Sequence, residues 1–249
     1  MIYKELQPHD QLTDLVKSYW WFNNTTSTPL DFTILPDGCF DLLVHFRNNE
    51  LIETSLTGIW TKQVDVSIEP NTQIFGIRFK LLAVDHIFKN KIADILNSES
   101  PVENGFWHIN KTDFSDLNNA TEHFDKIMLS ILSNKNSIDL KKKNLFNLLQ
   151  QTNGELTVQQ YSKQVFWTSR QINRYFNERF GISLKQYCNI LKVFASFKHI
   201  KSGQLYPEYN YFDRSHFIKS VKKHTGVNPE DLYENKNDRF LQLTTTAKK

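Results

Sequence analysis

The stretch "YFDRSHFIKSVKKHTGVNP", Tyr211–Pro229, mixes aromatic residues with three lysines and closes on a Gly and a Pro. The carboxylate of Asp213 can accept backbone N–H bonds, which predicts a helix that begins near Arg214. Gly226 is a residue type that commonly ends a helix, and Pro229 is well suited to begin the next one. The stretch is therefore predicted to hold one helix of about three turns followed by a short one.

Two kinds of side chain alternate around this predicted helix. Phe217 and Val221 fall on one side and are expected to face a core. The other side is expected to be exposed and to carry hydrogen-bond donors, namely Arg214, Ser215, Lys219, Lys222 and Lys223. Lysines on such a face can be merely solvated, but their spacing within little more than one turn favours contacts with phosphates. We interpret His216 as a packing and hydrogen-bonding residue, not as a ligand or base.

A similar pattern occurs upstream in "LTVQQYSKQVFWTSRQINRYFNERFGISLKQY", Leu156–Tyr187. Thr168 can cap a helix that ends at Gly181, and Ile172 and Phe176 would face inward. The opposite side is spaced i, i+3, i+4, i+7 and consists of Arg170, Asn173, Arg174 and Asn177. Arg recognises guanine and Asn recognises adenine in the major groove, and both bind phosphates. This is a helix-turn-helix pattern, with a buried salt bridge of Arg174 as the alternative to a DNA contact.

Between the two copies, Tyr187, Leu191, Phe194 and Ala195 indicate a longer connecting helix. A rigid helix would fix the distance between the two copies. If that distance is roughly 34 Å, both outer helices can enter successive major grooves on one face of a duplex.

The distribution of charge along the chain also favours a nucleic-acid partner for the C-terminal part. Residues 154–249 carry 16 Lys and Arg against 8 Asp and Glu, whereas residues 1–153 carry 14 against 19. The C-terminal part is thus basic (+8) and the N-terminal part acidic (−5), which favours a polyanionic partner for the former. The alternative is that the division arises by chance.

The first ninety residues predict short strands. "LDFTILPDGCFDLLVHF", Leu30–Phe46, holds two β-rich runs around a Pro-Asp-Gly turn, which favours a hairpin there. Three further stretches alternate in the same way: Glu50–Trp60, Val64–Pro70 and Thr72–Lys80. The fold class expected is α+β, with an N-terminal antiparallel β barrel or sandwich followed by helices and an all-α C-terminal domain.

A helical stripe follows the strands, in Leu117–Leu132, and it can serve as a core helix or as a dimer seam. The predicted division is a β-rich domain with trailing helices (1–150), a double helix-turn-helix domain (154–234) and a tail (235–249). The boundary rests on "QQTNGE" as the best linker candidate.

Residues 156–232 resemble the DNA-binding domain of the AraC/XylS family of bacterial transcription regulators. The residues that carry the resemblance are Thr168, Ile172, Arg174, Phe176, Gly181, Ser183 and Tyr187 in the first half, and Tyr211, Asp213, Ser215, His216, Phe217, Gly226 and Pro229 in the second. The resemblance implies that Arg170, Asn173 and Arg174 read bases in the first unit, and Arg214, Ser215 and Lys219 in the second. The stretches "ILPDGCFDL" and "FGIRFK" are similar, more weakly, to a β-rich sensory domain found in some members.

From the residues and the resemblance together, we expect a sequence-specific regulator that binds double-stranded DNA. RNA polymerase, a small-molecule effector and a second copy of the chain are further expected partners, and the expected location is the bacterial cytoplasm. Three departures from the family pattern stand out. Phe166 occupies a turn position where Gly is frequent, Asn210 replaces another Gly, and Pro207 interrupts the predicted first helix of the second unit.

Other functions find little support in the sequence. The histidines form no metal-ligating pair, no nucleophile elbow or phosphate-binding loop occurs, and so no cofactor, metal site or catalytic residue is expected. Asp37 and Asp41 are interpreted as a turn residue and a strand-end residue, not as an acid–base pair.

Trp20, Trp21, Trp60 and Trp107 can pack a core or line a pocket. The second hypothesis is an enzyme or small-molecule-binding protein centred on the β-rich part. No leader or membrane span is expected.

Overall fold

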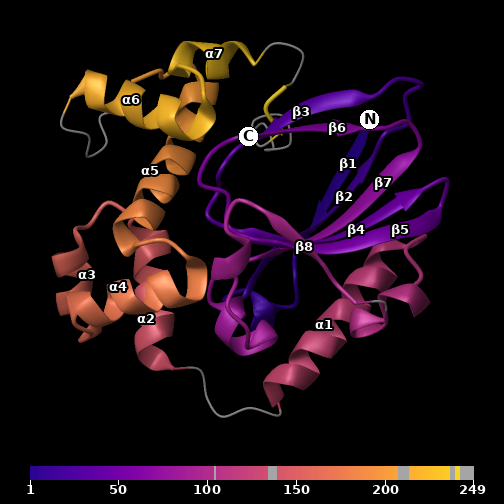
Figure 1. The fold of residues 1–249 in the computed structure, drawn as a ribbon, viewed down its shortest axis with the longest axis horizontal. Coiled ribbons are helices and arrows are strands. Elements are labelled where there is room, and N and C mark those ends of the chain that lie inside the picture. Colours follow the sequence, from indigo (N-terminus) through magenta and orange to yellow (C-terminus); the bar gives the residue numbers. More distant parts are fainter. Residues whose placement is uncertain (104, 134–138, 207–212, 236–238, 242–249) are drawn as a thin grey trace.

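The computed structural model describes residues 1–249 except 104, 134–138, 207–212, 236–238 and 242–249. Its N-terminal part is built on a six-stranded antiparallel sheet in the order β1-β2-β7-β4-β5-β8. The strands are β1 (Ile2–Leu6), β2 (Val16–Asn23), β4 (Phe40–Arg47), β5 (Glu50–Thr57), β7 (Thr72–Phe79) and β8 (Glu99–Pro101). The α+β fold class is confirmed, with the strands in open sheets (Figure 1).

A second sheet has two strands, β3 (Leu30–Ile34) and β6 (Val64–Ile68). The hairpin expected at Pro36–Gly38 is wrong, because β3 pairs with β6 whereas β4 pairs with β5 and β7. Residues 35–39 instead connect the two sheets and pack against a helix of the C-terminal part. The turn-forming residues were recognised, but the partners of the flanking strands depend on contacts distant in sequence.

Helix α1 (Leu117–Ser133) lies against the large sheet. Its stripe of Ala120, Phe124 and Met128 is fully buried, and Phe124 stacks on Phe75 of β7 with ring centroids 5.5 Å apart. These three residues serve the core, whereas the dimer use of the half-buried Leu117, Ile127, Ile131 and Leu132 stays a prediction. Four short helical turns complete the N-terminal part: η1 (Asp10–Leu12), η2 (Val84–Phe88), η3 (Ala93–Ile95) and η4 (Phe106–Lys111).

The C-terminal part is helical, as expected. Its helices are α2 (Leu140–Gln151), α3 (Val158–Val165), α4 (Ser169–Phe180), α5 (Leu184–Lys201), α6 (Arg214–Thr225) and α7 (Pro229–Glu234). Pro207, Asn210 and Tyr211 lie outside the described residues, and so does the predicted first helix of the second unit.

Helix α2 packs on the first helix-turn-helix pair. Phe146 of α2 lies 5.9 Å from Phe176 and 6.1 Å from Phe180, measured between ring centroids. The division of the chain at 150–154 stays a prediction. A fragment that begins at residue 154 would nevertheless lack one wall of the core of the first unit.

Two clusters of buried side chains join the two parts of the chain. The larger one runs without a break from the sheet through α1 and α2 into α3, α4 and the start of α5. The smaller one surrounds the end of α5, with α6, α7 and Phe240, and it includes Leu35 from the N-terminal part. In Figure 1, α3, α4 and α6 lie on the side of the molecule away from the large sheet.

Candidate nucleic-acid interface

Helices α3 and α4 form the first helix-turn-helix, and each begins with a reciprocal cap. The hydroxyl of Thr157 accepts the backbone N–H of Gln160, and Thr168 does the same for Gln171. Each Gln side chain in turn accepts the backbone N–H of its capping residue. Gly181 ends α4 with a φ of 75°, in the left-handed region that glycine adopts without strain. The boundaries predicted from Thr168 and Gly181 are confirmed.

The outer face of α4 carries exposed donors. Ile172 and Phe176 are completely buried, whereas Arg170, Arg174 and Asn177 are exposed. Arg174 meets Glu178 at 3.9 Å, but its side chain remains 71% exposed, so this ion pair is a weak surface contact. The alternative of a buried salt bridge at Arg174 is therefore wrong.

Asn173 has a different role from its neighbours. Its Nδ2 donates to the carbonyl of Ser169 at 3.1 Å, and its Oδ1 accepts the backbone N–H of Leu184 at 3.3 Å. The Nδ2 bond stays within α4, whereas the Oδ1 bond joins α4 to the first turn of α5. Asn173 thus helps to position α4 against α5, and its base-reading role stays a prediction, since the amide keeps a second N–H and a second lone pair.

Helix α6 has the two faces expected of it. Oδ1 of Asp213 accepts the backbone N–H of His216 at 2.7 Å and begins the helix, and Gly226 ends it with a φ of 76°. Phe217 and Val221 are buried. The exposed positions include Ser215, His216, Lys219, Lys222 and Lys223. The core position that the sequence did not reveal is His224, whose imidazole pKa is lowered by burial.

Arg214 stands at the edge of this exposed face. Its guanidinium lies 3.5 Å from the ring centroid of Tyr206, which is a close cation–π contact. Because Arg214 is exposed and supported from one side by the ring, it can still donate to a partner on the other side.

Helix α5 connects the two units. At 18 residues it spans about 27 Å by the rise of an α-helix. Eight of its residues are buried, which fits a rigid connection between the units. A common direction for the exposed faces of α4 and α6 stays a prediction.

The inner side of α4 is held by a carboxylate from the N-terminal part. Asp85 of η2 accepts from three donors: Lys142 Nζ at 2.7 Å, Arg179 Nη2 at 2.7 Å and the Tyr175 hydroxyl at 2.8 Å. Burial raises the pKa of Asp85, but these donors outweigh it and hold the pKa below its usual value. This cluster, which we name the Asp85 contact, was not found from the sequence, because Asp85 lies about 90 residues from its partners on α4.

We expect Asp85→Asn to lower the free energy of unfolding by about 2–3 kcal/mol at pH 7, since it removes the charge that three donors share. The folded-state pKa of Asp85 is lowered, so its contribution is present above the unfolded pKa of about 3.9 and is lost as the pH falls. Urea denaturation at pH 7 and pH 3 measures both effects.

The matched control is Asp94→Asn, because Asp94 is 69% exposed and pairs with Lys91 only three residues away. It should cost less than about 1 kcal/mol at either pH. A cost for Asp85→Asn that does not shrink at pH 3 would contradict the electrostatic explanation.

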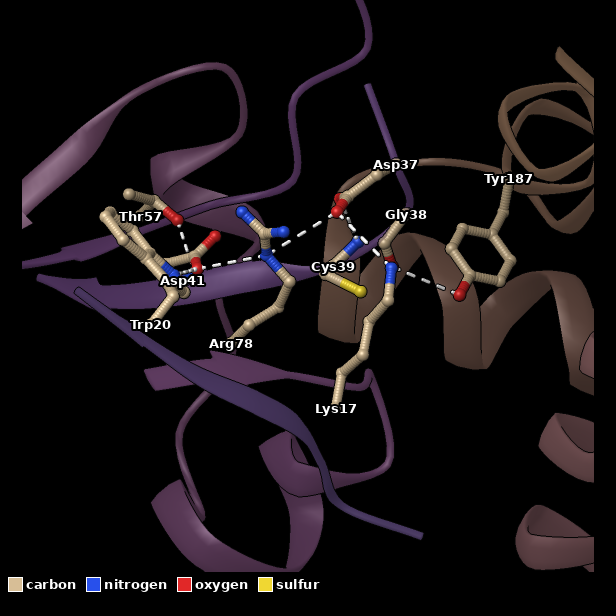
Figure 2. Close-up of polar contacts among 9 residues, drawn as sticks. All are labelled: Lys17, Trp20, Asp37, Gly38, Cys39, Asp41, Thr57, Arg78 and Tyr187. Atoms are coloured by element: carbon tan, nitrogen blue, oxygen red, sulfur yellow. Dashed lines mark hydrogen bonds and ion pairs between the residues drawn. The ribbon is translucent and has the colours of Figure 1, made fainter. Parts of the chain in front are cut away.

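A second contact between the two parts involves residues 35–39, which we name the Pro-Asp-Gly loop (Figure 2). The hydroxyl of Tyr187 on α5 donates to the carbonyl of Gly38 at 3.1 Å. A β-carbon placed on Gly38 would lie 3.0 Å from Leu191 and 3.1 Å from Tyr187. Glycine therefore allows the loop to lie directly against the helix, and the φ of 78° at Gly38 also favours glycine.

Charged side chains of the large sheet pair with Asp37 of this loop. Arg78 of β7 lies between two carboxylates, with Nε 3.6 Å from Asp37 and 3.3 Å from Asp41 (Figure 2). Asp41 faces Arg78 directly in the register of β4 and β7, and it also accepts from Trp20 Nε1 at 2.9 Å. Lys17 lies 3.6 Å from Asp37 and 4.6 Å from the ring centroid of Phe194 on α5. Three of these charged groups are at most 16% exposed and Lys17 is 33% exposed, and together the four join the sheet to α5.

Burial affects the two carboxylates differently. For Asp37, burial raises the pKa, but Lys17 and Arg78 together outweigh it, so the pKa is lowered. For Asp41, burial raises the pKa and Arg78 only partly compensates, so the pKa remains raised. The interpretation of these residues as a turn and a strand residue describes their backbone positions. That interpretation did not include the partner that the two carboxylates share, Arg78, which lies 37 residues beyond Asp41 in the sequence.

Two of the cavities among the described residues have aromatic walls in the N-terminal part. One of about 550 Å³ has aromatic walls and polar groups, with Trp21, Phe46, Asn49, Gln73, Asp113 and Phe114 among its lining residues. The other, of about 310 Å³, is lined by aromatic and aliphatic groups that include Phe88, Phe106 and Trp107. Of the four tryptophans singled out, Trp21 and Trp107 thus face cavities, whereas Trp20 lies over Gly76 and binds Asp41.

Over the described part of the chain, no three His, Cys, Asp or Glu side chains gather closely enough to hold a metal ion. None of the helices described has the length and hydropathy of a membrane span. Cys39 and Cys188 are both free and buried. Burial raises the pKa of each thiol to about 12.

The fold and the interface define a class of protein with a β-sheet domain followed by a helical region. That region presents a donor-rich helix at each end of a connecting helix. A family model described as a domain of unknown function, DUF6597, matches residues 4–101. No curated protein matches the chain.

Solved structures of ToxT from Vibrio cholerae are similar to this chain over nearly its whole length. A ToxT structure in the P21 form has a TM-score of 0.43 at 12% identity, covering 93% of this chain and 96% of ToxT. Wild-type ToxT of strain SCE256 with bound unsaturated fatty acid has a TM-score of 0.41 at 12% identity, covering 99% and 96%. ToxT of strain O395 bound to a naphthalenyl butenoic acid has a TM-score of 0.42 at 12% identity, covering 93% and 96%.

Proposed function

We propose that this chain is a sequence-specific DNA-binding transcription regulator of the AraC type. The observation that carries the proposal is the pair of exposed donor faces on α4 and α6, joined by the single helix α5. The basic balance of residues 154–249 supports it, because duplex DNA is a dense polyanion.

In this proposal each helix contributes side chains that meet base edges. These are Arg170, Arg174 and Asn177 on α4 and Arg214, Ser215 and Lys219 on α6, and each good bidentate contact contributes about 1–3 kcal/mol of discrimination. Lys222 and Lys223 on α6 bind phosphates. The two helices enter successive major grooves, so that one molecule covers two half-sites.

The N-terminal part is proposed to set the arrangement of these two units and to respond to a signal. The Asp85 contact holds α4, and the Pro-Asp-Gly loop holds α5, so a change in the sheet domain can reach both units. The cavity beside Trp21 offers room for a small-molecule effector. A homodimer, contact with RNA polymerase and a cytoplasmic location complete the proposal, and these three rest on the resemblance stated above.

The test uses the full chain, because α2 supports the first unit. Duplexes are selected from a random pool, and the affinity for the selected sequence and for random DNA is measured over a range of salt concentrations. A steep loss of affinity with salt, with tighter binding to the selected sequence, is expected. An absence of binding at low salt would reject the proposal and favour a small-molecule-binding function of the sheet domain.

Two substitutions separate base reading from phosphate binding. Arg170→Ala should reduce affinity for the selected sequence by about 5- to 100-fold and random binding much less, since an Arg–guanine contact is lost. Lys222→Ala should weaken both alike and reduce the salt slope by about one. Titrations with labelled duplexes measure both.

Lys126→Ala is the control, because Lys126 is exposed on α1, which belongs to the N-terminal part. This substitution should change neither the affinity for the selected sequence nor the affinity for random DNA. Equal losses on selected and random DNA for Arg170→Ala would exclude its base-reading role.

A further inference from the structure

The turn between α3 and α4 exposes an aromatic ring. Phe166 is 85% exposed, the highest value among the exposed large hydrophobic side chains of the described residues. Its backbone has a φ of 52° and a ψ of 42°, in the left-handed region that favours glycine. An exposed ring and an unfavourable backbone at the same position both oppose stability, so this residue needs another explanation.

Packing does not provide that explanation. The aromatic residue that the turn contributes to the core is the next one, Trp167, whose ring lies 5.3 Å from that of Tyr175. On the other side, Val165 is buried. The turn needs only backbone from residue 166, whose N–H donates to the carbonyl of Ser162 at the end of α3.

The position of the ring suggests its partner. Phe166 precedes the capping residue Thr168 by two positions, and the exposed Arg170 follows the cap by two. In a helix-turn-helix, the N-terminal end of the second helix is the part that approaches base edges in the major groove. Phe166 is thus exposed in the turn that leads directly into this end of α4.

We propose that Phe166 packs against a thymine C5-methyl group at the edge of the first half-site and thereby contributes to sequence specificity. This inference rests on the proposed function. The methyl group is the one apolar feature of the base edges in the major groove, and phenylalanine is among the side chains that contact it. A ring held in solvent by its own backbone is arranged for such a contact before DNA arrives.

The experiment replaces each thymine of the selected first half-site by deoxyuridine, which removes only the methyl group. The full wild-type chain should lose about 3- to 10-fold in affinity at one position, in line with burial of one methyl-sized group. Phe166→Gly should bind the thymine and uracil duplexes equally. Its Tm should be unchanged or higher by up to about 2–4 °C, because glycine suits the left-handed backbone.

Two controls accompany it. Arg170→Ala should keep the thymine-to-uracil difference while losing affinity. Tyr233→Ala, at another exposed aromatic residue, should keep both the thymine-to-uracil difference and the affinity for DNA.

The inference is overturned if no thymine matters to the wild type, or if Phe166→Gly keeps the difference. It is also overturned if Phe166→Gly lowers both the Tm and the affinity for all DNA, since that result describes a structural residue. In each of these outcomes the wild type still binds DNA in a salt-dependent manner, so the proposed function would stand.

Discussion

Replacing Arg78 by Met is expected to lower the free energy of unfolding by about 3–5 kcal/mol at pH 7. Arg78 lies between Asp37 and Asp41, and the side chains of all three are at most 16% exposed. Without the guanidinium, two largely buried carboxylates remain, and of the described side chains Lys17 is the cation that still pairs with one of them, Asp37. Such uncompensated buried charge is costly, whereas the added methionine fills much of the space.

The pH dependence of this loss identifies its cause. In the variant, burial and mutual repulsion should raise the folded-state pKa values of both carboxyl groups above their unfolded value of about 3.9. A group with a raised folded pKa favours the folded state only below its unfolded pKa, and that advantage is lost as the pH rises. The difference between wild type and variant should therefore be smaller at pH 4 than at pH 7.

Urea denaturation at the two pH values measures this effect. Arg47→Met is the matched control, because Arg47 is exposed at the end of the neighbouring strand β4. It should cost less than about 0.5 kcal/mol. A loss for Arg78→Met that stays equal at both pH values would show that packing, not charge, explains the effect.

The second large effect is expected for Gly38→Ala, at about 2–5 kcal/mol. The left-handed backbone costs an alanine about 1–2 kcal/mol, and the added carbon crowds Tyr187 and Leu191 at 3.0–3.1 Å for a further 1–3 kcal/mol. Because the crowding displaces the loop from α5, affinity for a duplex with both half-sites should also fall. Thermal unfolding and duplex titration measure the two results.

Gly105→Ala separates the two causes. Gly105 has a φ of 92°, but a carbon added there meets no atom within 4 Å. This control should show the backbone cost of about 1–2 kcal/mol without crowding or loss of DNA affinity. If the two variants prove equally destabilised, the contact between the Pro-Asp-Gly loop and α5 contributes nothing beyond the backbone conformation of Gly38.

The helices of the candidate interface were predictable because their signals are local. Thr168, Gly181, Asp213 and Gly226 are capping residues, and each helix boundary derived from them is confirmed. The exposure of Arg170 and Lys219 follows from helical periodicity alone. Periodicity places Asn173 on the outer face, but it does not reveal the bond from the Leu184 N–H, which depends on how α5 folds back.

The contacts between the two parts were not predictable. The turn residues Pro36, Asp37 and Gly38 suggested a hairpin, since a turn signal does not specify which strands pair across it. Arg78 and Asp85 gave no sequence signal, because their partners are far away along the chain.

The amino-acid sequence alone determined the helix boundaries, the inward and outward faces of α4 and α6, and the basic character of the C-terminal part. These properties depend on interactions within a few residues and on composition. Only the tertiary structure decided that Ala120, Phe124 and Met128 of α1 lie in the core, that Asn173 joins α4 to α5, and that charged side chains join the sheet to α5. The reason is physical: a buried charge or amide is stable only beside its partners, and folding alone brings together partners that lie 11 to 94 residues apart.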